Sequence, residues 1–130
     1  SKSDIEKMMA VWVDLPETCC IHPGGPLMSG IKQIELSWSH IFKQKVERFF
    51  RINTISRQIS SSLCISVVEE NISVDGINFS AAPIYATNVY KLHDDSWFML
   101  LHHASPAPVM QTTSQELFNL RTKRGPGKLH

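Results

Sequence analysis

Two stretches with helical periodicity precede a run of segments that are rich in β-branched and aromatic residues. Residues 3–14 and about 30–44 carry apolar side chains at spacings of three and four, which is typical of helices with one buried face. The later segments, separated by short polar turns, are residues 48–57, 62–73, 81–92 and 97–104. Helices followed by consecutive strands predict an α+β fold with a mainly antiparallel sheet, and not alternating βαβ units.

The length of the chain is that of one globular domain. It has 130 residues, of which 42% are hydrophobic and 19% charged, and domains most often contain about 100–150 residues. We predict a single domain over residues 1–110. The periodicity fades beyond about Pro108, and residues 111–130 combine basic side chains with Gly and Pro. We interpret this last segment as a C-terminal tail with the composition of a flexible chain.

Charge and motifs restrict the partners that the chain is expected to have. The formal net charge is only +1 and the basic residues are scattered before the tail, so we expect no nucleic-acid partner. No segment approaches the roughly 18 apolar residues of a membrane span, so we expect no membrane association. The sequence lacks metal-ligand spacings, phosphate-binding glycine loops and a nucleophile elbow. We therefore predict neither a metal nor a cofactor.

The cysteines indicate a cellular compartment. Cys19, Cys20 and Cys64 are odd in number and two of them are adjacent, which makes a poor disulfide framework. Free cysteines of this kind behave as small buried apolar residues in a reducing environment. We expect a cytoplasmic location.

Two blocks of sequence carry a resemblance to a known family. The first block consists of Trp12-Val13-Asp14, Cys20-Ile21-His22-Pro23-Gly24-Gly25, Gly30 and Ser37-Trp38-Ser39-His40-Ile41-Phe42. The second consists of Ala86-Thr87-Asn88-Val89-Tyr90, Trp97 and His102-His103-Ala104-Ser105-Pro106-Ala107-Pro108. Over roughly residues 4–110 the chain resembles the SnoaL-like branch of the nuclear-transport-factor-2-like superfamily. It is similar, more loosely, to the association domain of calcium/calmodulin-dependent kinase II.

This resemblance implies a fold, a pocket and an assembly. The fold is a cone-shaped, cystatin-like α+β barrel in which N-terminal helices pack into a strongly curved sheet. The pocket lies inside the cone, and two copies pack through the outer sheet face as a homodimer. The superfamily includes isomerases, dehydratases, cyclases and oligomerisation modules, so the fold does not define the function.

Aromatic side chains with a few polar groups are typical of pockets for small molecules, although they also fill ordinary cores. The residues that we predict to bind a small apolar ligand are Trp12, His22, Trp38, Asn88, Tyr90 and His103.

The candidates for acid–base chemistry are His103, Glu69, Glu70 and His22. Adjacent residues of a regular strand point to opposite faces, so only one of His102 and His103, and one of Glu69 and Glu70, can face the interior. His103 is preferred because the resemblance favours it. The choice between the two glutamates stays open.

Three functions remain on this basis. The leading hypothesis is a small-molecule-binding homodimer with an apolar pocket. An alternative is an isomerase, dehydratase or cyclase that uses His and Glu as general acid and base. A further alternative is an oligomerisation or interaction module. Whether the chain is an enzyme stays open.

Overall fold

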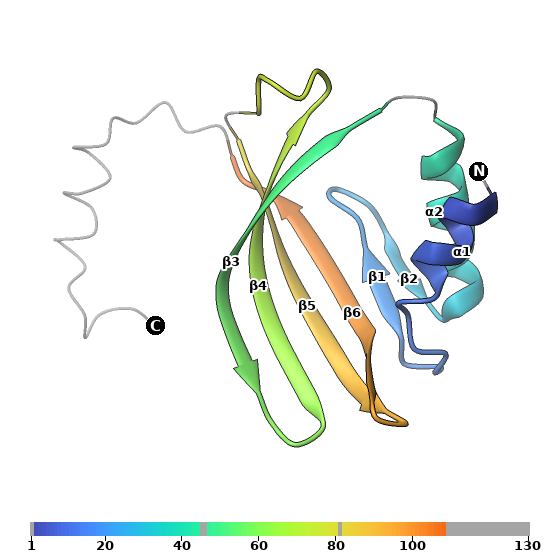
Figure 1. Cartoon of the computed structure of the whole chain (residues 1–130). Helices are drawn as coiled ribbons and strands as arrows, with labels where there is room; N and C mark the ends of the chain where they lie inside the picture. The colour runs from blue at the N-terminus through green and yellow to red at the C-terminus, as the bar shows by residue number, and fades with distance from the viewer. Residues whose placement is uncertain (1, 45–46, 81, 109–130) are drawn as a thin grey trace, which may run out of the picture.

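The structure is a computed structural model that describes residues 2–44, 47–80 and 82–108 (Figure 1). The predicted tail over residues 111–130 lies outside this part of the chain. The elements, in chain order, are α1 (Lys2–Met9), β1 (Cys19–Ile21), β2 (Leu27–Ser29), α2 (Ile31–Lys43), β3 (Phe49–Ile59), β4 (Leu63–Ser73), β5 (Ile84–His93) and β6 (Ser96–Pro106).

The strands form one sheet in the order β2-β1-β6-β5-β4-β3. All neighbours are antiparallel except β1 and β6, which are parallel. Figure 1 shows a strongly curved sheet, with both helices at the β1–β2 end and β3 at the far end. The predicted α+β class with a mainly antiparallel sheet is therefore confirmed. The sheet curls without closing, since β2 and β3 are its two edges.

The first helix is shorter than the sequence pattern predicts. It ends at Met9, and the following residues run alongside β6 instead of continuing the helix. The backbone N–H of Met99 donates to the carbonyl of Val11 at 2.7 Å, and the N–H of Val13 donates to the carbonyl of Met99 at 3.0 Å. These bonds hold Trp12 in a buried position against the sheet. The apolar spacing of the segment reflects this burial and not an additional helical turn.

The helices pack on the sheet through a small apolar cluster. Trp12, Cys20 and Ile34 are buried at its centre. Partly buried apolar side chains surround them: Met9, Met28, Ile31, Trp38 and Met99. Within the described residues, no helix is long and apolar enough to cross a bilayer.

A second cluster lies on the middle strands, where Val68, Ala86 and Ala104 are buried. These residues are paired across β4, β5 and β6 and so share one face of the sheet. Two of the three are alanines, whose side chains extend little above the sheet. The inner face of the sheet therefore carries its own buried cluster, separate from the one around Ile34.

The first prediction concerns Ile34 of α2, which is fully buried in the cluster with Trp12 and Cys20. Replacing it with Ala should lower the free energy of unfolding by about 2–5 kcal/mol, because the cavity left in the cluster cannot fully collapse. Urea denaturation followed by circular dichroism measures this change.

Leu36→Ala is the matched control, because Leu36 lies on the same helix and is 71% exposed. It should change the free energy of unfolding by no more than about 0.5 kcal/mol. Equal losses in the two variants would contradict the assignment of the buried helical face.

Candidate functional site

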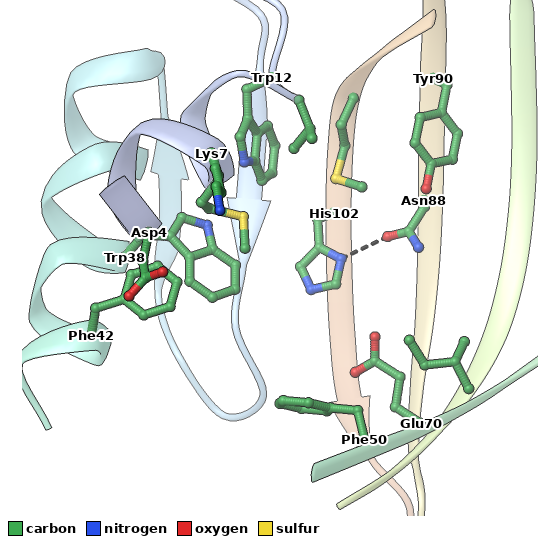
Figure 2. A pocket seen from close by; sticks show the side chains of 14 residues that line it. Asp4, Lys7, Trp12, Trp38, Phe42, Phe50, Glu70, Asn88, Tyr90 and His102 are labelled. Carbon is green, nitrogen blue, oxygen red and sulfur yellow. Dashed lines mark hydrogen bonds between the residues drawn. The ribbon is translucent and has the colours of Figure 1, made fainter. Parts of the chain in front are cut away.

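A cavity of about 540 Å³ lies between the helices and the inner face of the sheet (Figure 2). Its helical side is lined by Asp4, Lys7, Met8, Val11, Trp12, Trp38 and Phe42. Its strand side is lined by Phe50, Ile52, Glu70, Asn88, Tyr90, Met99 and His102. The lining is mostly apolar, and four of its side chains on the strand side are polar. This composition is typical of sites for small organic molecules.

A β-bulge determines which histidine faces this cavity. Val89 of β5 pairs with Leu101, but the next residue, Tyr90, pairs with Met99, so Leu100 is an extra residue in β6. The extra residue shifts the alternation of side chains by one position. Met99 and His102 therefore both line the cavity.

The expectation that His103 faces the interior is therefore wrong. His103 pairs with Thr87 on the opposite face of the sheet and is exposed. Regular alternation would have placed it with Met99, and the bulge at Leu100 reverses that relation.

The two glutamates are separated by ordinary strand alternation. Glu70 pairs with Ile52, and both line the cavity. Glu69 belongs to the outer face, where its carboxylate accepts a hydrogen bond of 3.2 Å from Nδ2 of Asn71. Of the pair that the sequence left open, Glu70 is the one in the cavity.

His102 and Asn88 form the closest polar contact in the cavity. Nδ1 of His102 lies 2.6 Å from Oδ1 of Asn88, on the adjacent strand β5. The amide oxygen is an acceptor, so Nδ1 carries the proton and Nε2 of the neutral ring does not. Burial, together with the positive charge that His22 and His103 can carry, lowers the pKa of His102 to about 4. The ring is therefore neutral at physiological pH.

Glu70 and Tyr90 lie on either side of this pair along the sheet. Figure 2 shows the Glu70 carboxyl and the Tyr90 hydroxyl pointing toward the His102–Asn88 contact from opposite directions. Burial raises the pKa of the Glu70 carboxyl above its ordinary value, because the charged form is desolvated. Burial likewise raises the pKa of Tyr90. The phenol is therefore protonated at neutral pH and can donate or accept a hydrogen bond.

His22 lies behind the wall of the cavity and does not line it. Its ring meets Trp38 edge-on at 4.8 Å between centroids and lies 6.4 Å from the ring of His102. Ser37 donates its hydroxyl proton to the carbonyl of Ile34, so it accepts from Nε2 of His22 at 3.1 Å. Burial lowers the pKa of His22. His22, which the sequence predicts as a ligand-binding and acid–base residue, is therefore outside the lining of this cavity.

The helical wall holds two indole groups without partners. Nε1 of Trp12 and Nε1 of Trp38 are buried and have no hydrogen-bond partner in the described part of the chain. An unsatisfied buried donor costs about 1–3 kcal/mol. This wall is therefore less favourably packed than an ordinary core of the same composition.

Four of the predicted ligand-binding residues line the cavity: Trp12, Trp38, Asn88 and Tyr90. The other lining residues, among them Phe42, Phe50, Ile52 and the side chains of α1, were not among the predicted ligand-binding residues. The spacing of Met8 and Trp12 indicated a common face, whereas the curvature that brings β3 opposite the helices has no local sequence signal.

The SnoaL-like domain matches residues 1–110, so the chain belongs to the SnoaL-like family. Among curated proteins it is similar to the F-box protein SKIP8 of Arabidopsis thaliana, with 28% identity over 101 residues. That match covers 78% of this chain and 42% of the relative. The chain thus spans less than half the length of that protein.

Solved structures support the same fold. A crystal structure from Thiobacillus denitrificans, assigned as a calcium/calmodulin-dependent protein kinase type II association domain, has a TM-score of 0.76 and 28% identity, and the match covers 82% of this chain and 85% of that one. A crystal structure from Streptomyces avermitilis, assigned as a dehydratase of the nuclear-transport-factor-2-like family, has a TM-score of 0.71 and 24% identity. The match covers 83% of this chain and 85% of that one. A domain of unknown function with a cystatin-like fold from Nostoc punctiforme has a TM-score of 0.65 and 18% identity, with coverages of 89% and 70%. The resemblance to the nuclear-transport-factor-2-like superfamily and the cystatin-like fold are confirmed.

A second prediction concerns the pH dependence of stability. The folded state lowers the pKa of His102 from 6.5 to about 4, so the unfolded chain binds more protons between these values. The contribution of His102 to the free energy of unfolding should therefore rise as the pH increases from about 4 to 6.5, by at most about 3 kcal/mol. Urea denaturation across this pH range measures it.

The wild type must be compared with His102→Gln, because Glu70 acts in the opposite direction. Because burial raises the pKa of Glu70, the folded state holds this proton to a higher pH than the unfolded chain does. The contribution of Glu70 to the free energy of unfolding therefore falls as the pH rises. This contribution cancels in the difference between the two proteins. A pH-independent difference would show that His102 is not held neutral by burial.

Proposed function

We propose that this domain binds a small, largely apolar molecule in the cavity between its helices and the curved sheet. The observation that carries the proposal is the cavity itself, which at about 540 Å³ falls within the range of roughly 300–1,000 Å³ that is usual for ligand sites. Its walls bring together aromatic rings from the segment that follows α1, from α2 and from β3, which supply apolar contact area. The polar groups of β4, β5 and β6 supply orientation.

We further propose that the domain is a homodimer packed through the outer sheet face. Apolar side chains gather there on neighbouring strands: Leu63, Ile65, Val67, Val89 and Leu101. Ile65 is 44% exposed and Leu63 is 39% exposed in the single chain. A continuous apolar patch on a soluble protein is commonly an interaction surface. The similarity to a protein assigned as a kinase association domain supports the same proposal.

An acid–base enzyme is the second candidate function. The cavity holds one group whose pKa moves toward neutrality, the carboxyl of Glu70, and one neutral imidazole, that of His102. Such groups are the components of isomerase and dehydratase chemistry. However, a general base acts best when its pKa lies near the operating pH. At about 4, His102 is a weak base, and ligand binding is therefore the stronger proposal.

A third prediction tests the cavity. Naphthalene is expected to bind with saturation at one molecule per chain, and it should quench the fluorescence of Trp12 and Trp38, which line the cavity. Ile52→Trp should reduce this affinity strongly, because Ile52 lines the cavity and is 59% exposed, so that a larger side chain takes up ligand space without disturbing the core. Fluorescence titration and calorimetry measure both effects.

Ile59→Trp is the control, because Ile59 lies on the same strand, is 67% exposed and does not line the cavity. Its affinity should match that of the wild type. Equal binding by Ile52→Trp and Ile59→Trp would place the probe elsewhere and would refute the proposed site.

A fourth prediction tests the assembly. Light scattering coupled to gel filtration should give the mass of a dimer for the wild type. Ile65→Glu should give a monomer, since it places a charge at the centre of the apolar patch. Leu36→Glu, on the exposed face of α2, should leave the dimer intact. A monomeric wild type at micromolar concentration would refute the proposed interface.

A further inference from the structure

The hydrogen-bonding pattern of the cavity defines the chemistry of its ligand more closely. We infer that the ligand carries a neutral hydroxyl group, which donates a hydrogen bond to Nε2 of His102. This inference rests on the proposed ligand-binding function and adds the identity of the polar group.

The first step concerns the tautomer of His102. At 2.6 Å from Oδ1 of Asn88, Nδ1 must carry the proton, because two acceptors would repel one another at this distance. A neutral imidazole has one N–H group, so Nε2 presents a lone pair. Asn88 is itself buried on the adjacent strand, which fixes the partner in place.

The second step concerns the direction of that lone pair. Nε2 has no hydrogen-bond partner among the described residues, and Figure 2 shows it pointing away from Asn88 into the space between the sheet and the helices. An acceptor in such a position needs a donor from a ligand or from solvent. A ligand that fills the cavity with apolar atoms alone would remove the solvent and leave Nε2 unsatisfied.

The third step concerns charge. The cavity is lined by two carboxyl groups, those of Asp4 and Glu70, and by a single basic side chain within the described residues, that of Lys7 on α1. A ligand carboxylate near His102 would place its oxygen lone pairs against that of Nε2 and would lie in the field of Glu70. A carbonyl oxygen also lacks a proton to donate. An alcohol or a phenol satisfies Nε2 without adding charge.

The fourth step concerns the body of the ligand. Trp38 and Phe42 stack with their ring centroids 5.8 Å apart, and both rings line the cavity opposite the strands. Flat aromatic walls favour flat partners, which gain offset-stacked or edge-on contacts. The ligand class is therefore a hydroxylated aromatic or polycyclic molecule.

Three probes of one shape test the inference: naphthol, naphthalene and naphthoate, titrated calorimetrically at neutral pH against the full chain. Naphthol is expected to bind roughly fivefold to tenfold more tightly than naphthalene, as expected for one net hydrogen bond. Naphthoate should bind most weakly. His102→Leu should abolish the advantage of naphthol while naphthalene still binds. His93→Leu, at the exposed end of β5, is the matched control and should preserve the advantage.

Asn88→Asp provides an independent test. A carboxylate beside Nδ1 favours the imidazolium form, in which Nε2 becomes a donor. The preference should therefore shift from naphthol toward naphthoate, a result that a merely structural role for Asn88 would not produce. The pKa of His102, followed by NMR in the same variant, should rise.

The outcomes separate the two proposals. Binding without a preference for naphthol, a preference for naphthoate in the wild type, or loss of the preference in Tyr90→Phe but not in His102→Leu would overturn the inference alone. Failure of all three probes to bind would overturn the proposed function together with it.

Discussion

In β6, Leu100 has no partner in β5, and the arrangement of the whole cavity depends on this extra residue. The bulge allows Met99 to bond to the segment around Trp12 while His102, three positions later, also faces inward. In a regular strand with Met99 facing inward, His103 would also face the cavity and His102 would face the outer side of the sheet. Asn88 would then have no imidazole beside it in the cavity. The bulge therefore lets one strand do two things that strict alternation of side chains would not allow. Met99 anchors the segment around Trp12, and the imidazole of His102 still faces the cavity.

The anchoring at Met99 also explains why the cavity is not filled by the helices. Because α1 ends at Met9 and the chain then follows β6, the helices are held against β1, β2 and the start of β6. Their apolar face is satisfied by a cluster around Ile34 at that end. The part of β4 and β5 that faces the cavity lies outside this cluster and carries Glu70, Asn88 and Tyr90. Curvature of the sheet then encloses the space, and side chains of β3 form its far wall.

The sequence predicted those features that depend on local patterning. The α+β class, the helix α2 and the four long strands follow from periodicity. Alternation along a strand correctly required that only one of Glu69 and Glu70 face inward. The inward position of His102 was not predicted. It depends on a bulge that arises from the pairing of two strands, and the residues of β6 alone do not indicate it. The end of α1 was missed for a related reason: the spacing of Trp12 fits a helix, and only its contact with Met99 shows that it packs as part of the sheet.

The partner of His102 decides what the cavity is suited to do. An amide accepts a proton from Nδ1 but offers the imidazolium no compensating charge, so desolvation is the largest cause of the lowered pKa. A shift from 6.5 to about 4 disfavours the charged ring by about 3 kcal/mol. A ring with this pKa recognises a donor well, since its lone pair stays available, but it takes up a proton poorly. Proton transfer in this cavity would have to begin at Glu70, whose carboxyl lies on another strand and is shifted toward neutrality. Under the proposed ligand-binding function, the Asn88–His102 pair would therefore serve recognition. Catalysis would instead require a bound molecule to place its reacting carbon beside Glu70.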